Sequence, residues 1–233
     1  GKTLLVWGEQ GVGAHIRMAR LFGELAAQAG KLIVETERRL LPLFSRSFPT
    51  VDFVAEKPEP DAALLAPDID MQSPMVSCAR WLRTRLDDFP VEAAYLIADA
   101  TKRDRWVKRL AAIPGKLKVG VSWRSGLTAF GREFSYADIA QWLPVLSIPD
   151  IAFINLQYGD CRDELARLRE LGGPELHQWP DIDLKDDFDD VAALVSELDL
   201  VVSAPISVAE LSGALGVPTW VLLLTHVSYV VHG

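Results

Sequence analysis

Short apolar runs alternate with segments of helical periodicity along the whole chain, and this alternation restricts the fold more than any other feature of the sequence. Each apolar run has the length of one strand that is buried on both faces. Strands that alternate with helices in this way are joined by right-handed crossovers and form parallel sheets. The expected strands cover residues 3–7, 31–36, 51–55 and 95–98 in the first half and residues 118–123, 152–157, 200–203 and 219–224 in the second.

The same pattern begins twice, and a Pro-Gly-Lys stretch at residues 114–116 is the best candidate for a linker. We therefore expect two Rossmann-like α/β domains, covering residues 1–114 and 115–233. The Pro- and Asp-rich residues 57–74 are expected to form a loop. Helices are expected between the strands, one ending at Gly30 and others over residues 38–48, 75–87, 104–113, 139–146, 164–171, 188–198 and 208–215.

Composition and charge exclude several classes of protein. Of the 233 residues, 49% are hydrophobic and 24% are charged, which is typical of a globular protein with a core of its own. A net charge of −8 disfavours binding of nucleic acid, which requires a surplus of basic side chains. The two cysteines and four histidines have no metal-ligand spacing, so we expect neither a metal nor another cofactor.

The sequence also lacks the pattern of a signal peptide and that of a membrane span. The N-terminus does not resemble a signal peptide, and the apolar run over residues 217–231 is too short and too interrupted for a membrane span. Together with the low cysteine content, this predicts a cytoplasmic location. Because the chain begins with Gly1 directly before a strand, we expect it to be a piece of a longer protein.

A glycine-rich turn, GEQGVG at residues 8–13, lies between the first strand and the first helix, which is a suitable context for a phosphate-binding loop. Its spacing is GxxGxG, and the alternative is a tight turn that only allows close helix packing. Glu35, near the end of the second strand, stands where a ribose-binding acid would lie, so a dinucleotide-dependent oxidoreductase is a further alternative. His15, in the first helical turn, is a candidate neutral base or a packed histidine.

Polar residues also follow two strands of the second half. Arg124, next to Ser125, could bind phosphate or carboxylate through two parallel hydrogen bonds, or could pair with a nearby acid. Gln157, Tyr158 and Gly159 leave the next strand and could hold a nucleobase, or could form an ordinary turn.

The segment over residues 203–210 joins a strand to a helix, and the free backbone amides near Ser207 could bind a diphosphate. Ser207 and Glu210 also match a capping box, in which both side chains bond to backbone amides. Residues 181–190 contain six aspartates, of which Asp186, Asp187 and Asp189 are expected to cap the following helix and complement its dipole.

Five stretches, taken in order, resemble a known family: LLVWGEQGVG, KVGVSWRSG, FINLQYGD, DDFDDVAALVSELDLVVSAP and VAELSGALGVPTWVLL. They are similar to the glycosyltransferase-like domain that follows tetratricopeptide repeats in many bacterial proteins and is related to the ADP-heptose lipopolysaccharide heptosyltransferases. The resemblance covers nearly the whole chain. It implies a GT-B fold, in which two Rossmann-like domains with parallel sheets face each other across a cleft. It also implies metal-independent, inverting sugar transfer, with the nucleotide sugar on the second domain, the acceptor on the first, and partner-binding repeats before Gly1.

Three residues depart from the pattern of this family. Ala14 replaces the acid that relatives carry after the last glycine of the first turn, and Pro205 and Glu210 replace an Asp and a His before the GALG helix. The backbone amides at the start of that helix do not depend on side-chain identity and are retained. His15 or Glu9 would then accept the proton of the acceptor, or the domain would bind without transferring.

The residues and the resemblance together predict a glycosyltransferase that moves a sugar from a nucleotide sugar to an acceptor, expected to be a protein hydroxyl such as one of flagellin. The acceptor would approach Gly11 and Gly13, with His15 or Glu9 as the catalytic base. The alternative is a catalytically inactive GT-B-like domain that recognises a protein or a nucleotide. The residues expected to bind the donor are Arg124, Ser125, Gln157, Tyr158, Gly159, Ser207 and Glu210.

Overall fold

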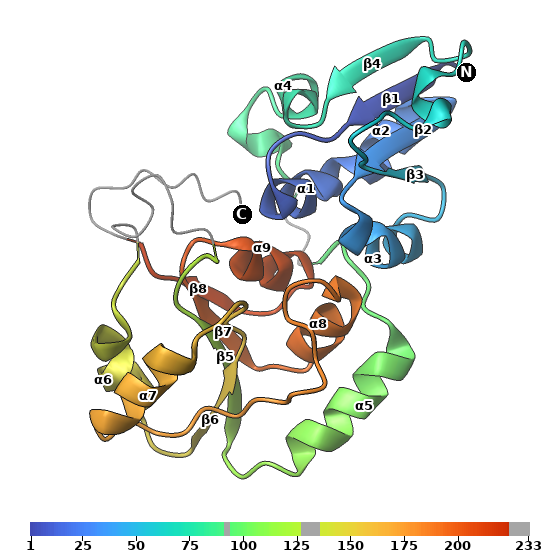
Figure 1. Cartoon of the computed structure of the whole chain (residues 1–233). Helices are drawn as coiled ribbons and strands as arrows, with labels where there is room; N and C mark the ends of the chain where they lie inside the picture. The colour runs from blue at the N-terminus through green and yellow to red at the C-terminus, as the bar shows by residue number, and fades with distance from the viewer. Residues whose placement is uncertain (91–93, 127–135, 224–233) are drawn as a thin grey trace.

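The computed structural model describes residues 1–90, 94–126 and 136–223, which form two parallel four-stranded sheets (Figure 1). The strand order is β3-β2-β1-β4 in the first sheet and β6-β5-β7-β8 in the second. The expected α/β class with two parallel sheets is confirmed. The strands are β1 (Thr3–Trp7), β2 (Lys31–Thr36), β3 (Asp52–Ala55), β4 (Met71–Pro74), β5 (Leu117–Ser122), β6 (Ile151–Asn155), β7 (Leu200–Ser203) and β8 (Thr219–Val221).

Helices connect these strands, as the periodicity predicts. The expected helix before Gly30 is divided by a 3-10 turn, and the helix expected over residues 75–87 is short because the Asp88 carboxylate binds the backbone N–H of Thr84 and Arg85 and begins a new turn. None of the described helices is long and apolar enough to cross a bilayer. The α-helices are α1 (Val12–Met18), α2 (Phe22–Gln28), α3 (Leu41–Ser47), α4 (Ala79–Leu82), α5 (Ala100–Ala111), α6 (Leu143–Leu146), α7 (Arg162–Glu170), α8 (Phe188–Val195) and α9 (Ser207–Ala214).

The fourth strand of the first sheet lies at Met71–Pro74, and the prediction of a strand over residues 95–98 is wrong. β4 pairs with β1 at the edge of the sheet, where proline and polar residues are tolerated, so its sequence lacks the buried apolar run that marks the other strands. Tyr95 and Leu96 instead both donate backbone hydrogen bonds, of 2.9 and 3.0 Å, to the carbonyl of Ala214. These bonds attach the crossing segment to the end of α9.

Helix α5 packs against α8. The buried Trp106 donates its indole N–H to Asp190 Oδ1 at 2.8 Å, and its ring meets Trp179 edge to face with centroids 4.9 Å apart. We call the parts of the chain built around the first and the second sheet the first and the second unit. Helix α5 therefore contacts the second unit although it precedes the expected linker. The domain boundary at residue 114 stays a prediction.

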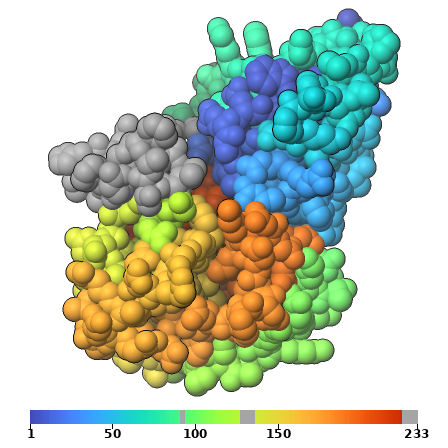
Figure 2. Space-filling model, viewed as in Figure 1, coloured from blue at the N-terminus to red at the C-terminus, as the bar shows by residue number. Residues whose placement is uncertain are grey.

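The two units are in direct contact. Helix α1 packs against α9 and α3 packs against α8, and one continuous cluster of buried apolar residues includes members of both units. Figure 2 shows the junction in space-filling form, where the blue first unit lies directly on the orange segment that contains α8. This packing fixes the position of the first sheet relative to the second, including the carboxyl ends of their strands.

Four phenylalanines form the aromatic part of the core in the first unit. The fully buried ring of Phe44 lies 5.7 Å from Phe22, 6.3 Å from Phe48 and 5.7 Å from Phe53, measured between centroids. Such tilted and edge-to-face contacts stabilise the core beyond the burial of area alone.

Phe44→Ala should lower the free energy of unfolding by about 3–5 kcal/mol, because it removes a buried ring and leaves a cavity. Urea denaturation followed by tryptophan fluorescence measures this difference. The control is Leu86→Ala, since Leu86 is 87% exposed, and it should change the stability by no more than about 0.5 kcal/mol. Similar losses in the two variants would contradict the assignment of Phe44 to the core.

Candidate functional site

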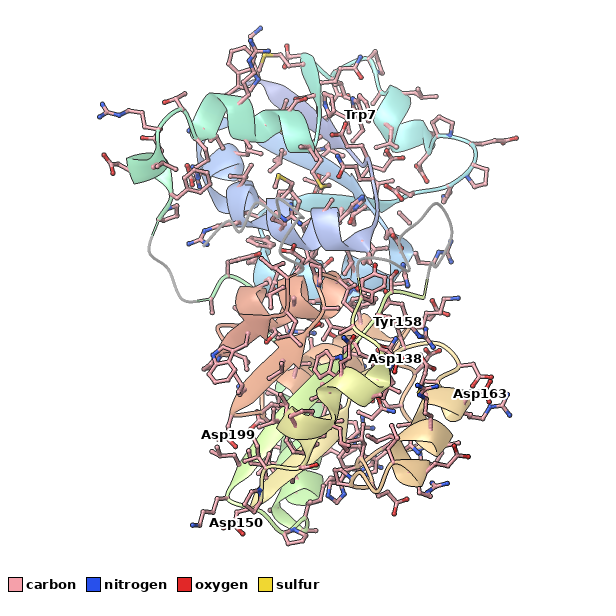
Figure 3. The ribbon with its side chains drawn as sticks, turned by 90° about the vertical axis from the view of Figure 1, so that its left-hand side faces the viewer. Trp7, Asp138, Asp150, Tyr158, Asp163 and Asp199 are labelled. Carbon is pink, nitrogen blue, oxygen red and sulfur yellow. The ribbon has the colours of Figure 1, made fainter. Side chains whose placement is uncertain are left out.

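The carboxyl ends of the strands in the second sheet face the first unit. Figure 3 shows Tyr158, which follows β6, on the side of the second unit that is nearer the first. Asp150 and Asp199, which precede β6 and β7, lie at the opposite end. Ligands of parallel α/β sheets bind at the carboxyl edge, so this is the side on which a site is expected.

Helices α1 and α9 meet at their first turns. A methyl group added at Gly13 would already touch Ser207, at 3.5 Å from its Cα, so the two helix starts are in close contact. Arg17 Nε donates to Glu210 Oε1 at 3.1 Å and joins the two units. The capping-box interpretation of Ser207 and Glu210 is wrong, because the N-cap of α9 is Ile206, which makes no side-chain capping bond. Glu210 bonds to the other unit instead.

The first backbone amides of α9 are not satisfied within the protein by the residues that the structure describes. Within the described part of the chain, no atom accepts a hydrogen bond from the backbone N–H of Ser207 or Val208. The amides in the first turn of a helix carry a partial positive charge. Whether an anion binds at the start of α9, as the sequence predicts, stays a prediction.

A cavity of about 620 Å³ opens beside the carboxyl end of β6. Tyr158, Gly159 and Asp160 line one side of it, and residues 178–185, among them Trp179, line the other. All its lining residues belong to the second unit. Of the residues expected to bind the donor, Gln157, Tyr158 and Gly159 line this cavity, whereas Arg124, Ser125, Ser207 and Glu210 do not.

The Gln157 side chain is buried and makes hydrogen bonds within the protein. Its Oε1 accepts the backbone N–H of Trp123 and of Arg124, both at 3.0 Å, and its Nε2 donates to the carbonyls of Arg124 and Tyr158, both at 2.9 Å. Gln157 therefore holds the loops after β5 and β6 together. Tyr158 also lines the cavity at this strand end, and its hydroxyl lies 3.3 Å from Ser125 Oγ.

Arg124 adopts the ion-paired alternative that the sequence left open. Its guanidinium bonds both carboxylate oxygens of Glu164, through Nε to Oε1 and through Nη2 to Oε2 at 2.8 Å, and Nη2 also donates to the carbonyl of Asp160 at 2.7 Å. Burial of Glu164 opposes its ionisation, but the hydrogen bonds from Arg124 and Trp123 hold the pKa of its carboxyl below the usual value. A role of Arg124 in donor binding would have to compete with this pair.

His15 is fully buried, so it has no surface through which to touch an acceptor. Its Nδ1 lies 2.9 Å from Thr36 Oγ1, and its Nε2 lies 3.4 Å from Glu56 Oε1 without hydrogen-bond geometry. Burial lowers the pKa of the imidazole, although the charge of Glu37 and the backbone of Glu9 oppose this shift. His15 is thus a neutral packed histidine, while Glu9 is half-buried in the loop that precedes α1.

Sequence reasoning missed Glu56 and Thr36 as neighbours of His15. Thr36 is the last residue of β2, and Glu56 directly follows β3, just as Gly8 directly follows β1. A search for polar residues at all carboxyl strand ends would have found them, whereas the glycine-rich turn directed attention to Gly11 and Gly13. In the structure Gly13 contacts Ser207, and the exposed Gly11 has no atom near the position of an added Cβ.

The acidic segment over residues 181–190 mainly joins elements of the structure. The Asp187 carboxylate accepts the backbone N–H of Asp190 at 3.0 Å, which confirms its predicted capping of α8. Asp189 lies in the first turn of α8, as the predicted complement to the helix dipole requires, and also pairs with Arg46, whereas Asp186 pairs with Arg39 of the first unit. No group of three potential ligand side chains that could hold a metal ion is found in the part of the chain that the structure describes.

Comparison with known proteins finds a relative in sequence. Protein FlbA of Caulobacter vibrioides is 35% identical over an alignment of 234 residues, which covers 95% of this chain and 39% of FlbA. The chain therefore spans about two fifths of the length of this relative. No protein-family model matches the chain.

Two solved structures resemble the chain over most of its length. A glycosyl transferase family 9 protein from Veillonella parvula has a TM-score of 0.61 at 10% identity, covering 94% of this chain and 80% of that protein. The ADP-heptose lps heptosyltransferase II of E. coli has a TM-score of 0.61 at 11% identity, with 96% and 85% covered. The chain has the GT-B fold. A single dinucleotide-binding domain, the alternative drawn from Glu35, does not account for the second sheet.

The burial of His15 makes the stability of the protein depend on pH. The folded state disfavours the imidazolium, so the unfolded chain binds a proton more readily as the pH falls below 6.5. The contribution of neutral His15 is complete above that pH and is lost as the pH approaches the lowered pKa of the folded state.

The stability advantage of the wild type over His15→Gln should therefore shrink between about pH 7.5 and about pH 5.5. Urea denaturation of both proteins at the two pH values measures the advantage. His177→Gln, which changes a partly exposed histidine, is the control. An advantage of the wild type over His15→Gln that is constant with pH would show that His15 does not titrate differently in the folded protein.

Proposed function

We propose that this chain is part of a glycosyltransferase that uses a nucleotide sugar as its donor. The observation that carries the proposal is the cavity beside β6, at the carboxyl edge of the second sheet of a GT-B fold. Its volume of about 620 Å³ lies in the range of small-molecule sites. Tyr158 and Trp179 offer aromatic surface to a nucleobase, and polar groups beside them can bind its edges.

The donor's phosphates would bind at the amides of Ser207 and Val208, whose partial positive charge stabilises anions. Because the leaving group is a phosphate, this charge would also stabilise the transition state. The name of the E. coli neighbour makes ADP-sugars the first donors to test.

The acceptor side lies at the glycine-rich turn, near Gly11 and Gly13. We infer a protein hydroxyl as the acceptor, with flagellin as the first candidate, and an inverting reaction without a metal. The acceptor oxygen would attack the anomeric carbon on the face opposite the phosphate, and the bond from that carbon to the phosphate oxygen would break. Tetratricopeptide repeats before Gly1 would select the protein partner, and the two free, buried cysteines suit the cytoplasm as the location.

A recognition domain without catalytic activity is the second candidate. Ala14 offers no base at the position where similar proteins carry an acid, and Arg124 is already paired with Glu164. Such a domain would bind a nucleotide or a protein but release no product. The experiments below separate the two candidates because they measure binding and turnover independently.

The correct nucleotide should raise the melting temperature of the protein, because a ligand that binds only the folded state stabilises it. Thermal-shift assays with ADP, UDP, GDP and CMP and their sugar derivatives measure this, and chromatography measures release of the free nucleotide. Tyr158→Ala should reduce the affinity at least about tenfold, equivalent to about 1.4 kcal/mol. Trp81→Ala, which removes a 73% exposed side chain of the first unit, should not. Binding without release would favour the recognition domain. No binding would exclude the glycosyltransferase and a nucleotide-recognition domain, and would leave only protein recognition.

Arg124→Ala should weaken donor binding more than about tenfold, or about 1.4 kcal/mol, if the guanidinium contacts phosphate. Glu164→Gln is the matched variant, because it breaks the same ion pair but leaves Arg124 free to bind the donor. Calorimetry with the nucleotide sugar should therefore show weak binding only for the Arg124 variant. Equal affinity of both variants and the wild type would limit Arg124 to its structural ion pair.

A further inference from the structure

A buried imidazole and a partly exposed carboxylate face each other at the carboxyl edge of the first sheet. His15 Nε2 lies 3.4 Å from Glu56 Oε1, and the exposed fractions of the two side chains are 0% and 34%. None of the described residues gives Nε2 a hydrogen-bond partner. Buried polar atoms are normally paired, so an unpaired nitrogen beside a carboxylate requires an explanation.

Three neighbouring strand ends hold this pair in place. Thr36 ends β2, and its Oγ1 lies 2.9 Å from His15 Nδ1. Glu56 follows β3, and its backbone N–H donates to the Thr36 carbonyl at 2.8 Å. Gly8 follows β1, where any side chain would overlap the Glu56 carboxylate and lie 2.8 Å from the imidazole. The absence of a side chain at Gly8 therefore allows the pair to form.

Thr36 can determine which nitrogen of His15 carries the proton. A neutral imidazole has one N–H, and an ionised carboxylate is stabilised by a donor. When the Thr36 hydroxyl donates to Nδ1, the N–H is on Nε2 and faces Glu56. Because burial lowers the pKa of His15, the neutral imidazole is a polar neighbour of the carboxylate that does not cancel its charge.

The surroundings make Glu56 a stronger base than an ordinary carboxylate. Burial, followed by the charges of Glu37 and Glu35, raises the pKa of the Glu56 carboxyl. Of the nearby cations, Arg39 pairs with Glu37, and Lys57 pairs with Asp61. General-base catalysis is most efficient when the pKa of the base approaches the working pH.

The loop beside this pair reaches the second unit. The loop that leaves Gly8 ends at Gly13, which contacts Ser207 at the start of α9. One short loop thus begins beside the Glu56 carboxylate and ends beside the amides proposed to hold the donor's phosphates. Glu9, whose backbone faces His15, belongs to the same loop.

We propose that Glu56 is the catalytic base of this chain and that His15 is its positioning residue. The inference rests on the proposed glycosyltransferase function. The carboxylate of Glu56 takes the proton of the acceptor hydroxyl while the acceptor oxygen bonds to the anomeric carbon. The bond from that carbon to the donor's phosphate oxygen breaks, and the nucleotide leaves with the electron pair. Glu56, and not the buried His15, touches the acceptor.

The test uses the full-length protein with ADP-heptose and, in parallel, UDP-, GDP- and CMP-sugars, with flagellin as the acceptor. Glu56→Gln should lower kcat for nucleotide release at least about a hundredfold, because Gln cannot accept the proton, and should leave the donor Kd within about twofold. Glu59→Gln is the matched control, since Glu59 is an exposed carboxylate three residues away, and it should have no effect. Melting temperatures show whether each variant is folded.

The pH dependence of kcat separates catalysis from a structural role. Glu37→Gln removes a charge that raises the pKa of Glu56, so the acid limb of the profile should move to lower pH. His15→Leu replaces the polar neighbour 3.4 Å from the carboxylate with an apolar one, so the limb should move to higher pH and kcat should fall at an unchanged donor Kd. Opposite shifts of this kind are not expected for residues that only stabilise the fold.

The possible failures are distinct. Unchanged turnover by Glu56→Gln would overturn this inference alone. Unmoved acid limbs in Glu37→Gln and His15→Leu would overturn the coupling of His15 to Glu56. If the wild type neither binds nor turns over any of the nucleotide sugars, the proposed function fails and the inference fails with it.

Discussion

The contact between α1 and α9 is the interaction on which the arrangement of the two units depends. Gly13 lets the first turn of α1 reach Ser207, and Arg17 bonds Glu210 one turn further along. The apolar residues around this contact join the cores of the two units into one cluster. Surface ion pairs contribute little stability by themselves, so the apolar contact supplies the energy and the ion pairs select the orientation.

The acidic segment over residues 181–190 also takes part in this junction between the two units. Asp186 and Asp189 bind Arg39 and Arg46, which belong to the first unit, while Asp190 binds Trp106 of α5. The segment therefore contacts the first unit on one side and α5 on the other. Its charge serves the assembly of the fold, which explains why a dense acidic run is compatible with a proposed phosphate-binding protein.

Polar residues at the strand ends divide into two groups. Gln157 and Arg124 have their hydrogen-bonding groups engaged within the second unit, where they hold neighbouring loops in place. The amides at the start of α9 and the Nε2 of His15 have no hydrogen-bond partner among the described residues. Buried or oriented polar groups that the fold leaves unsatisfied are the ones available for ligands and chemistry.

The sequence by itself determined the α/β class, the two successive parallel sheets and most of the strands, because buried parallel strands are continuous apolar runs that periodicity reveals. It did not reveal β4, whose polar edge position removes that signal, or the attachment of Tyr95 and Leu96 to α9, which depends on a distant carbonyl. It located the strand ends of the second unit but could not show that Arg124 forms an ion pair with Glu164. Only the tertiary structure brought His15, Thr36 and Glu56 together, because hydrogen-bond partners and burial depend on residues that are far apart in the chain.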